Sequence, residues 1–144
     1  MNDVQMSEFF LNDRFAALTG AKIISIASDT VTCMLEIQDC HFNAANSVQG
    51  GAIFTLADYA FAVASNRADL EKESGAITVA QSCNITFFKP ARGKTLIATT
   101  KCLQKGHKVS VWQIDVRDEL GTHVAQMLGN GYTVSPRPAP DKHS

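Results

Sequence analysis

A Gln-Gly-Gly triplet followed by an apolar segment with one acid is the part of this sequence best suited to chemistry. Gly50 and Gly51 precede a run of Ala, Ile, Phe and Leu residues, and Asp58 stands within that run. Desolvation there should raise the pKa of a carboxylate toward the range of a general base or a nucleophile. Amides at a helix start have no intrahelical acceptor and lie at the positive end of the dipole. The sequence therefore predicts an oxyanion hole at the glycines and a reactive acid at Asp58. The alternative is structural: a common Gly-Gly turn before an apolar helix, and an Asp that only caps or pairs.

The spacing of these groups limits how they act together. Asp58 follows Gly50 by eight residues, which is about 12 Å along a helix axis. One substrate carbonyl therefore cannot contact both groups of one helix. If both act on the same atom, the carboxylate comes from a second copy of the chain, with the two helices side by side about a twofold axis. We expect an obligate homodimer with shared sites.

Helical segments are predicted at two places. Residues 51–67 are apolar on nearly every side, which favours a helix enclosed by the rest of the fold. A shorter helix, capped by Ser7, is expected to end near Gly20. Its apolar face is formed by Phe9, Phe10, Phe15, Ala16 and Leu18. The charged residues 69–75 are predicted to form a solvated turn.

Six segments rich in β-branched residues and bounded by turn residues predict strands. They are residues 21–28, 31–37, 76–88, 95–103, 108–117 and 122–134. Short connections favour antiparallel neighbours, with the first two strands as a hairpin. One apolar helix needs a curved sheet around it. We therefore predict an α+β fold, a curved antiparallel six-stranded sheet wrapped around one long central helix.

Composition is typical of a plain globular enzyme of one domain, predicted over residues 1–134. The chain has 144 residues, 45% of them hydrophobic, and a net charge of -1, which gives no electrostatic case for nucleic acid or an anionic membrane. Residues 135–144 are Pro-rich and are expected to be a disordered tail. No signal peptide or membrane span is evident, so we expect a cytoplasmic protein.

Two classes of site are disfavoured by motif. The four cysteines, at positions 33, 40, 83 and 102, lack metal-ligand spacing, so we predict buried, reduced thiols and no metal site. No Gly-rich loop followed by Lys and Ser or Thr is present, which excludes a P-loop nucleoside triphosphatase.

Asn43, the Gly-Gly pair and the sequence Leu-Ala-Asp-Tyr-Ala at 56–60 resemble the hotdog-fold acyl-CoA thioesterases of the phenylacetic-acid-degradation (PaaI) type. Residues 84–93, Asn-Ile-Thr-Phe-Phe-Lys-Pro-Ala-Arg-Gly, are similar to the strand of that family that ends in a Pro and Gly turn, and residues 96–98 to the strand that follows. The resemblance covers most of the chain. It implies the hotdog fold and hydrolysis of an acyl-CoA thioester without a cofactor, because CoA is part of the substrate.

The resemblance also implies roles for particular residues. The Gly50 N–H would polarise the thioester carbonyl, helped by Asn43 and Gln49, with Gly51 contacting the substrate. The partner's Asp58 would act as general base or as nucleophile. The family usually has His before Gly-Gly, whereas Gln49 can donate a hydrogen bond but cannot titrate near neutral pH.

One further position departs from the family pattern. Some relatives carry Ser or Thr on the next strand to orient the attacking water, where this chain has Ala80. Ser82 or Thr78 are the possible substitutes.

An acyl-CoA ligand needs cations for its phosphates and an apolar site for its acyl group. Basic residues on predicted turns are Lys89, Arg92, Lys105 and Lys108, and among them Arg92 matches the family most closely. Phe54, Tyr59 and Phe61 are candidates for the acyl site, with a plain core role as the alternative.

The histidines and the tryptophan have simpler interpretations. His41 is either a proton shuttle or a solvated loop residue. His107 and His123 are expected to have cross-strand surface roles, and Trp112 to lie in the core or an interface.

Two other functions stay open at this point. The first is a non-catalytic acyl-CoA binding or sensing protein, in which Gln49 marks lost chemistry, although no DNA-binding extension of a repressor is visible. The second is a hotdog enoyl-CoA hydratase, but that branch has a His a few residues after the Asp, and none follows Asp58 closely. The acyl group, its carrier (CoA or acyl carrier protein) and the pairing of dimers into tetramers are also left open, although we expect a dimer of dimers.

Overall fold

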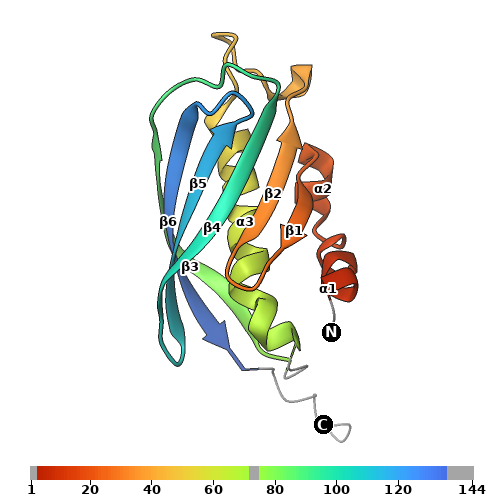
Figure 1. Ribbon diagram of the computed structural model, residues 1–144, viewed down its shortest axis with the longest axis vertical. Helices are drawn as coiled ribbons and strands as arrows, with labels where there is room; N and C mark the ends of the chain where they lie inside the picture. Colours follow the sequence, from red (N-terminus) through yellow and green to blue (C-terminus); the bar gives the residue numbers. More distant parts are fainter. Residues whose placement is uncertain (1–2, 72–74, 136–144) are drawn as a thin grey trace, which may run out of the picture.

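Six strands form one antiparallel sheet, with a long helix along one of its faces (Figure 1). The computed structural model describes residues 3–71 and 75–135. The strands are β1 (Lys22–Ile26), β2 (Val31–Glu36), β3 (Ile77–Phe87), β4 (Thr95–Lys105), β5 (Val109–Asp118) and β6 (His123–Val134), in the order β1-β2-β4-β5-β6-β3. The predicted six strands are confirmed, with ends that differ by no more than two residues. The β1–β2 hairpin is also confirmed.

The long helix α3 (Gly50–Glu71) packs against β2, β3, β4, β5 and β6. It extends four residues beyond its predicted end and takes in residues 69–71 of the predicted turn, while residues 72–74 lie outside the described part of the chain. The prediction that the helix is enclosed on all sides is wrong. Gly51 is exposed and the side chains of Thr55, Asp58 and Ala62 are only half-buried. Their spacing puts them on one helix face, so the sheet covers one side of α3 and leaves a stripe open.

Two glycines of β6 allow α3 to approach the sheet closely. Phe61 is 1% exposed and lies against Gly129 and Gly131. A Cβ atom on Gly131 would lie 2.6 Å from Cγ2 of Thr78 and 3.3 Å from the Phe61 ring. Any side chain there would therefore clash first with Thr78 and would also press on the aromatic ring that anchors the helix.

A side-chain amide attaches the edge strand β3 to α3. Asn66 is buried; its Oδ1 accepts the Thr78 N–H at 2.7 Å and its Nδ2 donates to the Thr78 carbonyl at 3.0 Å. Asn66 thus satisfies the backbone of Thr78 as a neighbouring strand would. The helix and the edge strand are held in one fixed relation.

The N-terminal segment forms two short helices beside β1, not the single predicted helix (Figure 1). They are α1 (Asp3–Phe10) and α2 (Arg14–Thr19). Asp13 caps α2 through Oδ1, which accepts the Ala16 N–H at 3.0 Å. Ser7 lies inside α1 and caps nothing. The cap at Asp13 competes with continuation of α1, which explains the break.

The predicted apolar face of this segment is only partly buried. Phe10 and Ala16 join the core, whereas Phe9, Phe15 and Leu18 are exposed.

Trp112 lies in the core, one of its two predicted places. The prediction that all four cysteines are buried is wrong, because Cys40 and Cys102 are exposed.

No helix in the described ranges is long and apolar enough to cross a membrane. Apart from Ser135, the predicted tail lies outside the described residues.

Candidate active site

A tight loop places the start of α3. Asn43 Oδ1 accepts the N–H groups of Ala45 and Ser47 at 2.9 and 3.1 Å, and the Asn43 N–H donates to the Ser47 carbonyl at 2.7 Å. The Gln49 N–H donates to the carbonyl of His41 at 2.8 Å. The Oδ1 atom of the predicted site residue Asn43 therefore holds the loop, and its exposed Nδ2 is the part of the amide available to a ligand.

The first amides of α3 have no acceptor. The Gln49 carbonyl accepts the N–H groups of Ala52 and Ile53 at 3.0 and 3.3 Å, but no acceptor among the described residues pairs with the N–H of Gly50 or Gly51. These are the donors that the sequence predicted for an oxyanion. Oε1 of Gln49 lies 3.2 Å from where a Gly51 Cβ would be, so the Gln49 side chain borders the same place.

Two cavities lie on either side of this helix start. The β3-side cavity, of about 300 Å³, is lined by Ser47, Val48, Gly50, Ile53, Phe87, Phe88, Lys89 and Pro90. The α2–α3 cavity, of about 470 Å³, is lined by Phe15, Leu18, Thr19, Cys40, His41, Gln49, Gly51, Ala52, Phe54 and Thr55. Since Gly50 lines one cavity and Gly51 the other, a carbonyl held by their amides would border both.

Asp58 lies two turns along the open face of α3. Burial raises the pKa of its carboxyl, and the charge of Asp13 raises it further. Within the described ranges, Asp58 has no hydrogen-bond or ion-pair partner. The helix is continuous from Gly50 to Asp58, so the separation of about 12 Å stands. Within one chain, the structure does not bring the oxyanion donors and the acid together.

Two basic residues lie at the same end of the sheet as Gly50. Lys89 lines the β3-side cavity, and Arg92 is exposed on the turn that follows. Asp118 Oδ2 accepts the N–H groups of Arg92 and Gly93 at 2.8 and 3.0 Å. The Glu119 carboxylate accepts those of the next two residues, Lys94 and Thr95.

These carboxylates are bound to backbone amides in their charged form. Burial opposes ionisation of Asp118, but the N–H groups of Arg92, Thr122 and Gly93 outweigh it and lower its pKa to about 2. The N–H of Lys94 lowers the pKa of Glu119. A side chain at Gly93 would meet the Glu119 carboxylate and would displace the group that accepts the N–H groups of Lys94 and Thr95. The turn that presents Arg92 is thus rigidly held.

Lys105 and Lys108 lie at the other end of the sheet from Gly50. The Lys108 carbonyl accepts the Thr133 N–H at 2.7 Å, near the end of β6, whereas Gly50 lies against Phe87 at the end of β3. Phe87 pairs with Ala125 near the start of the antiparallel β6. One chain therefore does not bring Lys108 to the Gly50 amide, and its predicted role in binding substrate depends on another copy.

His41 is neither a proton shuttle nor a solvated loop residue. It is 6% exposed, its Nδ1 accepts the Gln38 N–H at 2.9 Å, and its Nε2 lies 2.7 Å from the carbonyl of Thr19. This arrangement requires the proton on Nε2. His41 therefore joins the end of α2 to the loop before α3.

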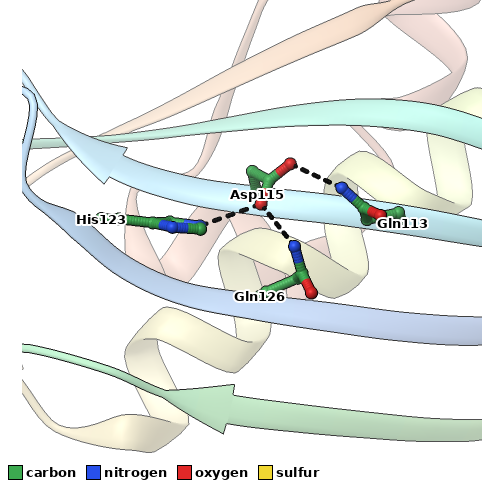
Figure 2. A network of polar contacts seen from close by, with 4 residues as sticks. All are labelled: Gln113, Asp115, His123 and Gln126. Carbon is green, nitrogen blue, oxygen red and sulfur yellow. Dashed lines mark hydrogen bonds and ion pairs between the residues drawn. The ribbon is translucent and has the colours of Figure 1, made fainter.

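A second polar cluster lies on the face of β5 and β6 opposite α3 (Figure 2). Asp115 accepts hydrogen bonds from His123 at 2.9 Å and from Gln113 and Gln126 at 3.0 Å. Although burial opposes it, these bonds, that of Gln126 foremost, lower the pKa of Asp115. The expected cross-strand role of His123 is confirmed. Its partner was missed because the pairing depends on the register between two strands.

No set of three or more His, Cys, Asp or Glu side chains within residues 3–71 and 75–135 could hold a metal ion. Among the substitutes for a serine on β3, the Thr78 hydroxyl is bonded to that of Thr133 at 2.8 Å. Ser82 is exposed on the edge strand.

Comparison with known proteins agrees with this architecture. The family model of the thioesterase superfamily matches residues 45–125. The chain is 32% identical over 127 residues to a putative esterase of Archaeoglobus fulgidus, which covers 88% of this chain and 79% of that protein. It is 31% identical over 124 residues to the acyl-coenzyme A thioesterase PaaI of Escherichia coli strain K12, which covers 85% and 84%.

The solved structure of the E. coli PaaI protein, from the phenylacetic acid degradation operon, has the same fold. It superposes with a TM-score of 0.79 at 28% identity and covers 90% of both chains. The chain therefore belongs to the thioesterase superfamily and is a hotdog-fold thioester hydrolase related to PaaI.

Proposed function

We propose that this protein hydrolyses acyl-CoA thioesters with small, medium-chain or aromatic acyl groups to the free acid and CoA. The observation that carries the proposal is the pair of unpaired amides, Gly50 and Gly51, at the start of α3. Donors fixed at the positive end of a helix stabilise the oxygen that becomes negative when water attacks the carbonyl. Gln49 borders the same place and assists as a hydrogen-bond donor. Asn43, whose Oδ1 holds the loop before α3, is proposed to supply a further donor through Nδ2.

In the proposed reaction, the partner's Asp58 removes a proton from water, whose oxygen attacks the thioester carbon. The tetrahedral intermediate then collapses with breakage of the C–S bond, and the CoA thiolate takes a proton. Alternatively, the partner's Asp58 attacks the carbonyl itself and forms a mixed anhydride that water hydrolyses. Neither route needs a metal or a cofactor beyond the CoA of the substrate.

The shared site requires a dimer, and the edge strand β3 supports one. β3 pairs with β6 on one side only, and its apolar residues Ile77, Val79 and Phe87 are about half exposed. An unpaired apolar edge favours addition of another strand. A second β3 placed there by a twofold axis would set two open α3 faces side by side, and Asp58 lies on that face. Lys89 and Arg92 would bind the CoA phosphates, with Lys108 of a neighbouring copy as a further cation.

Gly50→Pro tests the oxyanion hole. Proline removes the N–H but is tolerated at the first helical position. We expect kcat for octanoyl-CoA, followed as thiol release, to fall about 100-fold or more. Gly50→Ala is the matched control, because it adds the same Cβ contact with Phe87, at 3.0 Å, and keeps the N–H. Equal losses in both variants would argue against the role of the amide.

A single turnover in ¹⁸O water tests the nucleophile route. Label in the Asp58 carboxylate after one turnover would indicate the anhydride, because a general base does not exchange its oxygens. Label in the fatty acid alone is expected from a general base and also from attack of water on the acyl carbon of the anhydride, so capture of the anhydride by hydroxylamine separates those two. A wild type that binds acyl-CoA but releases no thiol would instead favour the binding or sensing function, with Gln49 as the reason.

A further inference from the structure

We propose that the acyl group of the substrate lies in the α2–α3 cavity and that Phe15 and Leu18 of α2 select its length and shape. This inference rests on the proposed function and gives the bound substrate a direction. The CoA arm leaves through the β3-side cavity, and the thioester lies between the two cavities at the start of α3.

The first support is the continuity of the cavity with the proposed oxyanion hole. Gln49 and Gly51 themselves line the α2–α3 cavity. A carbonyl held at the Gly51 amide would place its acyl carbons at this opening. At about 470 Å³, the cavity falls within the range of small-molecule sites.

The second support is the difference in chemistry between the two cavities. The residues described around the α2–α3 cavity include no Asp, Glu, Lys or Arg, and they include the apolar Phe15, Leu18 and Phe54. The β3-side cavity is also lined by apolar side chains, among them Val48, Ile53 and Phe87, but of the two linings it is the one that includes a cation, Lys89, and the exposed Arg92 follows on the next turn. An acyl chain gains free energy from apolar contacts and CoA phosphates from cations, so each end of the substrate matches one cavity.

The third support is that the walls are held in place before any ligand binds. Nε2 of His41 donates to the Thr19 carbonyl at 2.7 Å, which fixes the end of α2. Asp13 caps the other end of α2 through the Ala16 N–H. A preformed site avoids the entropic cost of ordering α2 on binding.

The fourth support is the exposure of the cavity rim. Phe15 is 64% exposed and Leu18 is 80% exposed. Large apolar side chains that border an apolar cavity gain free energy from any apolar cover. An acyl chain in the cavity would supply that cover. A second copy of the chain is the competing occupant, and the experiment distinguishes the two.

The test compares kcat/KM across straight-chain acyl-CoA substrates from two to twelve carbons, with phenylacetyl-CoA included. Phe15→Ala widens the cavity, so we expect the optimum to move to longer chains and the phenylacetyl substrate to lose about tenfold. Leu18→Trp narrows the rim, so the longest substrates should lose about tenfold and the optimum should shorten. Opposite shifts from two variants cannot come from loss of folding.

Leu11→Ala is the matched control. Leu11 is 71% exposed on the same N-terminal segment but lines a different cavity, so its variant should keep the wild-type length profile. Unchanged profiles in Phe15→Ala and Leu18→Trp would overturn the inference. The inference would also be overturned if Phe88→Ala, on the β3-side cavity, moved the optimal chain length and the two α2 variants did not. A third contradicting result would be α2 variants that change only the oligomeric mass in light scattering.

A binding series keeps this inference separate from the proposed function. Calorimetric Kd values for non-hydrolysable acyl-CoA thioethers of the same lengths need no turnover. If Kd depends on chain length and this dependence shifts in the two α2 variants, the acyl site is supported. This conclusion holds even if the wild type hydrolyses nothing, and then only the proposed function fails. A Kd that ignores both variants overturns the acyl site even if the enzyme is active.

Discussion

At the residue scale, the proposed chemistry depends on an acid without a matching cation and on a glutamine that cannot titrate. Asp58 is half-buried and has no partner among the described residues. The ionised carboxylate of Asp58 therefore lowers the free energy of unfolding, and such a cost is typical of functional carboxylates. Gln49 contributes donors without a charge change near neutral pH. Activity and stability should respond to these two residues in different ways.

Replacement of Asp58 separates the two effects. Asp58→Asn should lower kcat by at least about 100-fold, because the amide cannot accept the proton of water. Burial raises the pKa of Asp58, so its charge opposes folding at pH 7 and the melting temperature should stay the same or rise. Thiol-release kinetics measure kcat and calorimetry measures the melting temperature. Asp29→Asn, at an exposed position, is the control. Retained turnover would exclude Asp58 as the reactive group.

The pH profile is a second residue-scale prediction. Since Asp58 must be ionised to act, kcat/KM should rise with pH through an apparent pKa above the ordinary aspartate value of about 3.9. Gln49 adds no step, so the profile should be level through pH 6 to 8. Gln49→His should add a step near the ordinary histidine pKa of about 6.5. A neutral step already present in the wild type would show that another group controls the rate.

At the element scale, pairs of elements are joined by few but well-placed polar contacts. Asn66 attaches β3 to α3, and His41 attaches α2 to the loop before α3. Asp118 and Glu119 together accept the N–H groups of residues 92–95. Each contact satisfies a backbone group that would otherwise be unpaired. These contacts set where the functional loops lie.

The Asp118 contact predicts a defined sensitivity to acid. Its folded pKa, about 2, is below the unfolded value of about 3.9. The stabilisation is therefore fully present above about pH 4 and is lost as the pH falls toward 2. Asp118→Asn should be less stable at pH 7 by about 2 kcal/mol, with a smaller further loss between pH 4 and 2. Urea unfolding at each pH measures this, and parallel pH curves for both proteins would contradict it.

At the scale of the whole molecule, we propose that one chain carries two halves of different sites. The Gly50 amide and Asp58 lie on the same helix but too far apart for one carbonyl. The described residues leave both the open α3 face and the β3 edge uncovered. A dimer would therefore complete two sites at once, and a monomer would complete none.

Mixed dimers test this arrangement. Gly50→Pro and Asp58→Asn each inactivate both sites of their own homodimer, but a mixed dimer keeps one intact site. After unfolding and refolding of an equal mixture, activity should recover to about a quarter of wild type, since half the dimers are mixed and each has one working site. Each variant refolded alone is the control. No recovery, with mixed dimers confirmed by mass spectrometry, would exclude a shared site.

Local pattern was enough to predict the six strands and the long helix, and to name the candidate residues for the chemistry. Strand alternation, the apolar run of α3 and the Gly-Gly pair all depend on neighbours within one or two turns, and the predicted strand ends differ from the observed ones by no more than two residues. Asp58 was recognisable because a lone acid in an apolar run is costly wherever the helix packs. The cap at Asp13 was a local signal that a competing cap at Ser7 obscured.

Contacts between distant residues were decided only by the tertiary structure. Asp115 meets His123 through the register of β5 and β6, and Asp118 reaches residues 92 and 93 across 25 or more positions. The burial of His41 depends on α2, which lies 22 residues earlier at Thr19. Such pairings follow from how strands align and which faces are covered, and those choices are made by the free energy of the whole fold. Sequence can therefore name candidate reactive groups, but only packing determines what surrounds them.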